Sequence, residues 1–138
     1  MPAVRRGIPG TGRSLRLLAM PDSTTTLAAL KEAMRRFVAE REWEQFHSPK
    51  NLVMGLSVEA AELTEHFLWI DNEASRQVVG DAAKMGEIAD EMADVTCYLL
   101  ALCNTLGIDL SDAVRAKLVK NAVKYPAEKC RGKYRVED

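Results

Sequence analysis

Apolar residues recur at helical spacing along most of the chain, and short polar segments separate one run from the next. The clearest run steps by four and three residues from Ile88 to Leu106, and Gly107 follows it directly. This stripe predicts a helix over residues 81–106 that ends at Gly107, since glycine favours the position just past a helix C-terminus. The same spacing predicts three further helices: residues 27–42, residues 49–69, and a stretch that begins after Asp109 or Ser111 and ends at Pro126.

Local signals at the segment boundaries support this division. Ser48-Pro49 combines an N-cap residue with proline at the first helical position, which marks the start of the second helix. Residues 71–80 are polar and are predicted to be a connection in which the chain reverses. Glycine and proline recur over residues 1–22, so we expect a disordered tail there and one domain over residues 23–138, whose last dozen residues are irregular.

Four helices joined by modest loops predict an all-α fold with a four-helix bundle-like protomer. A hydrophobic content of 47% suffices for a core, and an aromatic content of only 6% favours helices over a sheet. The helix over residues 81–106 has apolar or small residues on nearly all sides. Such a helix needs cover from several directions, so we expect a homo-oligomer.

Charge and hydropathy argue against two classes of partner. The formal net charge is -1, and the first twenty residues hold four Arg and no acid, which leaves 15 basic and 20 acidic residues in the remainder. This mildly acidic body argues against nucleic acid as a partner. No apolar run approaches the length of a membrane span, so no membrane partner is expected. Cys97, Cys103 and Cys130 are odd in number and lack metal-finger spacing, which indicates reduced thiols and a cytoplasmic location.

Two pairs of acidic residues occupy the middles of the two longest predicted helices. Glu59 and Glu62 lie three residues apart in one helix, and Glu91 and Asp94 lie three apart in the other. Residues at this spacing share a helix face, so two such helices can aim four carboxylates at one point. Solvated surface acids are the alternative, but both pairs lie beside apolar stripes and small residues. Clustered carboxylates near a core need a cation or a proton, and for a cation an all-oxygen donor set favours Mg²⁺, with Mn²⁺ as the alternative.

Aromatic and basic side chains near these acids are candidates for substrate binding. The aromatic candidates bracket the second helix or follow the acid stripe by one turn: Trp43, Phe46, His47, Trp69 and Tyr98. They could stack on a nucleobase, whereas closing the ends of the core is the alternative for the tryptophans. The polar candidates share one face of the last predicted helix: Lys117, Asn121 and Lys124. They could bind phosphate oxygens or form a solvated face.

These residues together resemble a known family. Glu59-x-x-Glu62 followed by Glu91-x-x-Asp94 resembles the signature of the all-α nucleoside triphosphate pyrophosphohydrolases, the MazG-like superfamily. Within it, Trp43-Glu-Gln-Phe-His47 with Pro49 and Asn51-Leu52 resembles the dCTP pyrophosphatase branch. A second segment resembles the same branch: Lys117-x-x-x-Asn121-x-x-Lys124-Tyr125-Pro126. The resemblance covers residues 27–134.

The resemblance implies a site and a reaction. It implies that the four acids bind Mg²⁺, and that an attacking water is oriented by a carboxylate, for which we choose Glu62. It assigns the base and sugar pocket to the five aromatic candidates, and the triphosphate to Lys117, Asn121 and Lys124, supplied by the same or a neighbouring subunit. The products are then a nucleoside monophosphate and pyrophosphate. One departure is Met34, where the branch is expected to carry a histidine.

The resemblance also implies self-association, because family members are dimers or, in this branch, tetramers. Two alternatives remain open. The first is an enzyme of the same fold that acts on dUTP, phosphoribosyl-ATP or another nucleotide. The second is a non-enzymatic helical oligomerisation module whose acids are merely exposed.

Overall fold

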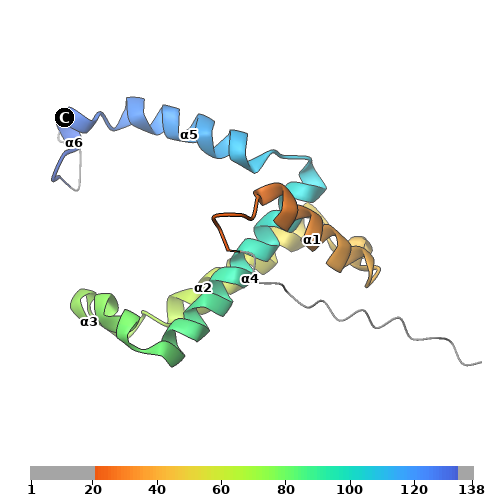
Figure 1. The fold of residues 1–138 in the computed structure, drawn as a ribbon, viewed down its shortest axis with the longest axis horizontal. Helices are drawn as coiled ribbons and strands as arrows, with labels where there is room; N and C mark the ends of the chain where they lie inside the picture. Colours follow the sequence, from red (N-terminus) through yellow and green to blue (C-terminus); the bar gives the residue numbers. More distant parts are fainter. Residues whose placement is uncertain (1–20, 134–138) are drawn as a thin grey trace, which may run out of the picture.

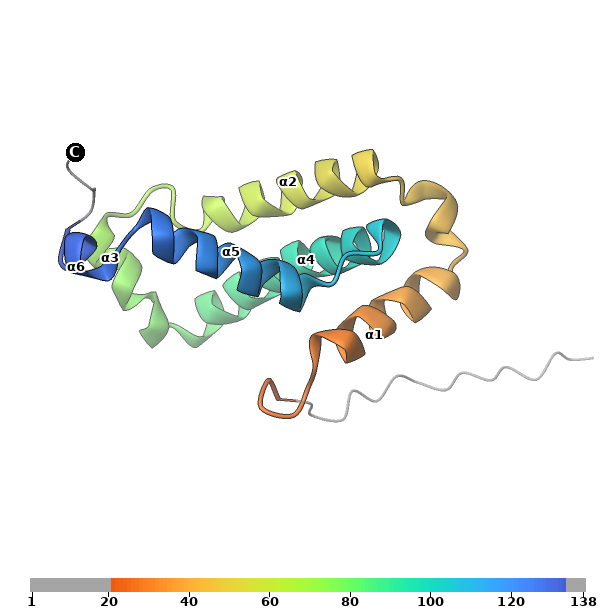
Figure 2. The same cartoon turned by 90° about the horizontal axis from the view of Figure 1, so that it is seen from above.

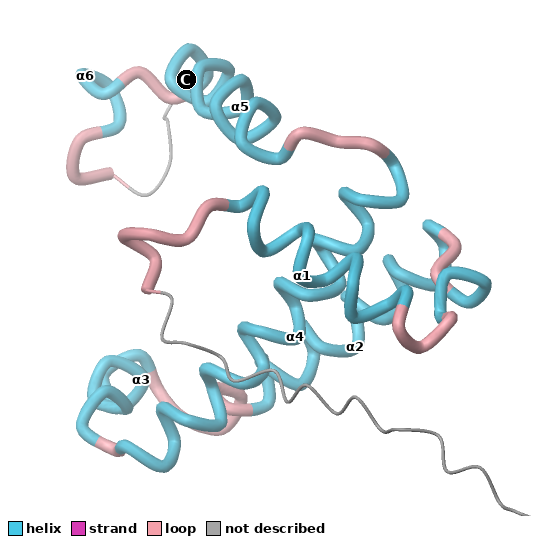
Figure 3. Tube along the Cα trace, turned by 45° about the vertical axis from the view of Figure 1, so that its right-hand side comes forward, coloured by secondary structure: helices cyan, strands magenta, loops and turns pink. Residues whose placement is uncertain are grey.

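The structure, a computed structural model, describes residues 21–133. These residues form helices joined by short loops, with no strand among them (Figure 3), which confirms the all-α prediction. The predicted tail over residues 1–22 lies outside the described residues except for Pro21 and Asp22, and it stays a prediction.

Two long antiparallel helices form the centre of the fold. They are α2 (Pro49–Glu65) and α4 (Ala82–Leu106), which lie side by side along their length (Figures 1 and 2). A third helix, α1 (Leu27–Ala39), packs on α4. Their shared core is small and contains Val38, Leu52, Ile88, Leu100, Ala101 and Cys103. Leu52 is the most enclosed side chain, at 1% exposed. This pair brings the middles of α2 and α4 face to face.

The predicted helix signals act as expected at both ends of the central pair. The Ser48 hydroxyl accepts a hydrogen bond from the Asn51 amide at 3.2 Å, directly before proline at the first position of α2. The Asp81 carboxylate accepts from the Lys84 amide at 3.0 Å at the start of α4. Gly107 ends α4 with φ of 66°, a left-handed conformation that glycine adopts without strain.

The predicted ends of two helices were wrong. The first helix ends at Ala39, before residue 42, and Glu42 then takes a left-handed φ of 54° ahead of the 3-10 turn η1 (Trp43–Phe46). The second helix ends at Glu65, before residue 69, because its backbone shifts to three-residue hydrogen bonds, such as Phe67 N–H to the Thr64 carbonyl at 3.0 Å. The apolar spacing continues past Ala39 and Glu65, but the α-helical pattern of backbone hydrogen bonds ends at these residues.

Two segments predicted to lack structure contain short helices. Residues 71–80 form α3 (Asn72–Gln77) and the 3-10 turn η2 (Val78–Gly80). The Asp71 carboxylate caps α3 by accepting from the Ala74 amide at 2.8 Å, and this local cap outweighs the lack of an apolar stripe. Near the C-terminus, α6 (Ala127–Cys130) follows Pro126, whose carbonyl accepts from the Cys130 amide at 3.0 Å.

The last long helix, α5 (Leu110–Lys124), forms as predicted with Asp109 as its cap. It projects away from the packed helices (Figure 1) and has little contact with them. Its apolar residues are therefore exposed, and Val123 reaches 78%. All four predicted long helices exist, but only three of them pack together within one chain.

No single helix in the described part of the chain is long and apolar enough to cross a membrane. Only α4 and α5 taken together pass a test of length and composition, and they are bent by 102° where they meet.

Candidate functional site

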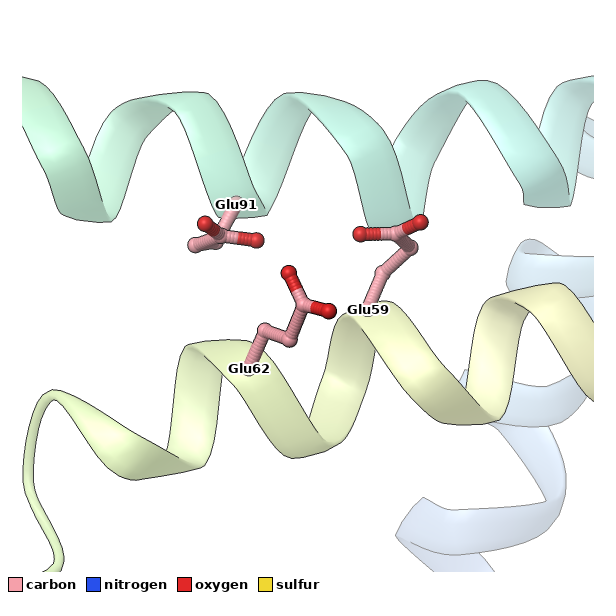
Figure 4. A group of neighbouring side chains, drawn as sticks. All are labelled: Glu59, Glu62 and Glu91. Carbon is pink, nitrogen blue, oxygen red and sulfur yellow. The ribbon is translucent and has the colours of Figure 1, made fainter.

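Three carboxylates converge where α2 and α4 face each other (Figure 4). Glu59 and Glu62 point from α2 toward Glu91 on α4, and each offers an oxygen within 4.8 Å of the others. The three-residue spacing on α2 places its two acids on one face, and antiparallel packing brings α4 opposite them. The fourth predicted acid, Asp94, lies outside this group and lines a cavity beside Glu59.

The electrostatics of this cluster would favour a bound cation. Oε2 of Glu91 is buried and has no hydrogen-bond partner. Partial burial raises the pKa of Glu59, and three neighbouring negative charges raise it further: Glu62, Asp94 and Glu91. A divalent cation would relieve both the unpartnered oxygen and the repulsion. Hard cations prefer an all-oxygen donor set, so the residues present fit such an ion.

An aromatic cavity of about 300 Å³ adjoins the acids. Its walls include three of the predicted base-binding residues: Trp43, His47 and Tyr98. Glu59 and Asp94 also line it, so one end of the cavity is acidic. The aromatic wall is held by an edge-to-face contact between Phe37 and Trp43, whose ring centroids lie 5.9 Å apart. The cavity therefore joins an apolar slot to a carboxylate cluster.

Sequence reasoning missed three residues of this cavity. They are Phe37, Cys97 and Ala101, none of which the sequence analysis assigned to the site. Cys97 follows Asp94 by three residues and so shares its helix face, a signal that could have identified it. Burial raises the pKa of the Cys97 thiol, and the charge of Asp94 adds to the shift. Cys97 therefore belongs to the wall as a neutral thiol.

Gly55 is a further residue that the sequence did not single out. It lies on α2 where the ring of Tyr98 approaches, and a Cβ at this position would lie 2.6 Å from Cζ of Tyr98. Real Cβ atoms do not tolerate such an approach. The missing side chain thus lets the Tyr98 ring, which lines the cavity, lie close against α2.

Gly55→Ala is expected to lower the free energy of unfolding by about 1–2 kcal/mol relative to Gly86→Ala. Both glycines are inside helices, so both substitutions gain helix propensity, but a Cβ at Gly86 meets nothing within 4 Å. Urea unfolding of the two variants measures the difference. Equal stabilisation of both would contradict the placement of Tyr98 against α2.

Five of the eight predicted substrate-binding residues do not line the cavity within one chain. Trp69 follows α2 and is 89% exposed, and Phe46 is also exposed. The other three lie on α5, away from the acids: Lys117, Asn121 and Lys124. The arrangement of one chain therefore supplies the acids and most of the aromatic wall, but none of the predicted phosphate-binding residues.

A sequence profile described as the MazG-like family matches residues 54–134, which contain all four acids. The chain belongs to the MazG-like family. Among the curated relatives of this MazG-like chain, dCTP pyrophosphatase 1 of Homo sapiens is 38% identical over 111 residues, which cover 80% of this chain and 65% of that protein. The same-named protein of Bos taurus is 36% identical over 110 residues, with 80% and 65% covered.

A solved structure agrees with this assignment. A pyrophosphatase from Archaeoglobus fulgidus is 39% identical to this MazG-like chain and has a TM-score of 0.68. The match covers 72% of this chain and 92% of that one. The chain spans just under two thirds of the length of the curated relatives named above.

Proposed function

We propose that this MazG-like protein is a Mg²⁺-dependent nucleoside triphosphate pyrophosphohydrolase that acts on dCTP or a related pyrimidine deoxynucleotide. The observation that carries the proposal is the carboxylate cluster of α2 and α4 opening directly onto an aromatic cavity. The names of the curated relatives, dCTP pyrophosphatase 1, support the same substrate class. The role would be to remove excess or modified nucleotides from the pool in the cytoplasm.

The cavity suits a nucleoside in size and chemistry. Its volume of about 300 Å³ lies at the lower end of small-molecule pockets. Trp43 and Tyr98 offer ring faces for stacking, and the half-buried His47 offers a polar edge for the base or sugar. Met34 lines the same cavity, so an apolar side chain would contact the base there. A nucleoside bound in this cavity would place its α-phosphate beside Glu59 and Asp94.

The acids would hold the metal and handle the proton. Glu59, Glu62, Glu91 and Asp94 are the proposed ligands of Mg²⁺, with Mn²⁺ as an alternative. The bound ion would neutralise charge on the phosphate oxygens. Glu62 is exposed to solvent beside the half-buried Glu91, where it can orient a water and take its proton. The water oxygen bonds to the α-phosphorus, the bond to the bridging oxygen breaks, and pyrophosphate leaves.

Product analysis with a panel of deoxynucleoside triphosphates, with and without Mg²⁺, tests this function. Monophosphate and pyrophosphate formed fastest from dCTP or a 5-modified analogue would support the proposal. Faster turnover of dUTP or phosphoribosyl-ATP would keep the reaction and change the substrate. A non-enzymatic oligomerisation module predicts no turnover and no Mg²⁺-dependent shift in melting temperature, whereas specific binding to the folded state requires a shift.

The raised pKa of Glu59 predicts an opposite pH dependence with and without metal. In the metal-free protein, Glu59 contributes stability below the ordinary glutamate value of 4.5, and this contribution is lost as pH rises through the raised pKa. With Mg²⁺, stability should instead rise over the same range, because the ion binds deprotonated acids. Melting temperatures of wild type and Glu59→Gln, compared across pH, isolate this residue. Identical pH profiles of the two proteins would contradict the assigned shift.

We further propose that a second copy of the chain completes the site, within a homodimer or a homotetramer. The free helix α5 exposes apolar residues that one chain leaves uncovered: Val114, Leu118, Val119 and Val123. It also carries Lys117, Asn121 and Lys124, which complement the acidic face of α2 and α4. In such an assembly these residues would meet the triphosphate of the neighbouring subunit, and Trp69 and Phe46 would close the base pocket.

A further inference from the structure

A second cavity lies on the other side of the acid cluster. It is open, has a volume of about 420 Å³, and is lined by Glu62, Glu65, His66, Lys84 and Glu91. Glu62 and Glu91 thus face this cavity, whereas Glu59 and Asp94 face the aromatic one. The acids therefore separate an apolar, aromatic space from an open, polar space.

This division would set the direction of a nucleotide bound as proposed above. With the base in the aromatic cavity and the α-phosphate at the acids, the β- and γ-phosphates would extend toward the second cavity. A polyphosphate needs positive charge along its length. Among the residues that line these two cavities, Lys84 is the only lysine or arginine.

The surroundings of Lys84 leave its ammonium free to change partners. Its Nζ lies 3.3 Å from Oε2 of Glu87, in a pair three residues apart whose side chains are 33% and 60% exposed. Exposed pairs of this kind contribute little to stability. Lys84 also lies in the first turn of α4, where the helix dipole disfavours a cation. Helix stability therefore gives no reason for a lysine at this position.

We propose that Lys84 binds the β- and γ-phosphates of the substrate and the pyrophosphate that leaves. This inference rests on the proposed function and adds a phosphate-binding residue from the same chain as the acids. Lys84 exchanges Glu87 for phosphate oxygens when the nucleotide binds. The two products are then held at opposite ends of the acid cluster, with the monophosphate on the aromatic side and pyrophosphate on the Lys84 side.

Calorimetric binding of each product separately, in saturating Mg²⁺, tests the assignment. Lys84→Met is expected to raise the Kd of pyrophosphate about tenfold, as for loss of a charge-assisted hydrogen bond, while the Kd of dCMP stays within twofold. Lys84→Arg should restore most of the pyrophosphate affinity. Lys50→Met is the matched control, since it removes the same charge from an exposed position of α2 that lines neither cavity. Tyr98→Ala should give the reverse pattern, with weaker dCMP binding and unchanged pyrophosphate binding.

The outcomes separate this inference from the proposed function. Wild-type turnover of a nucleotide together with unchanged pyrophosphate binding by Lys84→Met would overturn the role of Lys84 alone. An equal loss of affinity for both products would also overturn it, because it would indicate a general structural effect. Pyrophosphate binding that depends on Lys84 in a protein that hydrolyses no nucleotide would support the phosphate site and overturn the proposed function.

Discussion

Glu62→Gln is expected to lower the rate of pyrophosphate release at least a thousandfold. The substitution keeps the size of the side chain but removes one ligand charge from the cluster and the group that takes the proton of the attacking water. Loss of general base catalysis alone typically costs a factor of about 10²–10⁴. A thousandfold loss corresponds to about 4 kcal/mol of transition-state stabilisation. Steady-state release of pyrophosphate from dCTP measures the effect.

The same variant should not be less stable than wild type without metal. Glu62 is one of the charges that raise the pKa of Glu59, so its neutralisation relieves repulsion within the cluster. The melting temperature without Mg²⁺ should therefore stay equal or rise, while the increase caused by Mg²⁺ should shrink. Glu73→Gln is the matched control, because it removes an exposed glutamate of α3 that belongs to neither the acid cluster nor the two cavities. Full turnover by Glu62→Gln would rule out its proposed role.

Mixing two inactive variants is expected to restore activity if neighbouring subunits share the site. One variant carries Glu62→Gln, and the other carries Lys117→Ala with Lys124→Ala. In a mixed dimer, one site combines intact acids from one chain with an intact α5 from the other. When equal amounts are mixed, about half of the dimers contain one chain of each variant. Each of these dimers has one working site of two, so about a quarter of wild-type activity should return.

The controls for this experiment are the two variants alone and a mixture that cannot exchange subunits. Each variant alone should be inactive, and activity after mixing should grow as subunits exchange. Unfolding and refolding the proteins together should give the same final activity. Two variants that are each inactive but never complement each other would show that α5 serves the acids of its own chain. Full activity of the Lys117 and Lys124 variant would show that α5 takes no part.

The sequence predicted a helix or a helix boundary correctly where residues within one short stretch decide it. The stripe from Ile88 to Leu106 with Gly107 behind it predicted α4 closely, and Ser48-Pro49 predicted the start of α2. The predicted ends at residues 42 and 69 were wrong because apolar spacing says nothing about where the backbone changes its hydrogen-bond pattern. The helix α3 was missed because its cap, Asp71, acts without an apolar stripe.

For the four acids too, the sequence predicts some features of the site, and the packing of the helices decides the others. The three-residue spacing of Glu59 and Glu62 placed both on one helix face from the sequence alone, because helix geometry fixes that relation. The sequence did not decide that one oxygen of Glu91 would be buried without a partner, or that Asp94 would face the aromatic cavity instead of the cluster of three. Those outcomes depend on how α2 and α4 are rotated against each other.

By itself, the sequence determined the four long helices, the starts of α2 and α5, and the pairing of acids within each helix, since all of these depend on residues a few positions apart. Only the tertiary structure decided what lies on either side of the acids. The fit of Tyr98 against Gly55 and the shared cavity of Lys84 and Glu62 join residues that are distant in the chain. Such contacts arise from the packing of α2 on α4, which no local pattern specifies.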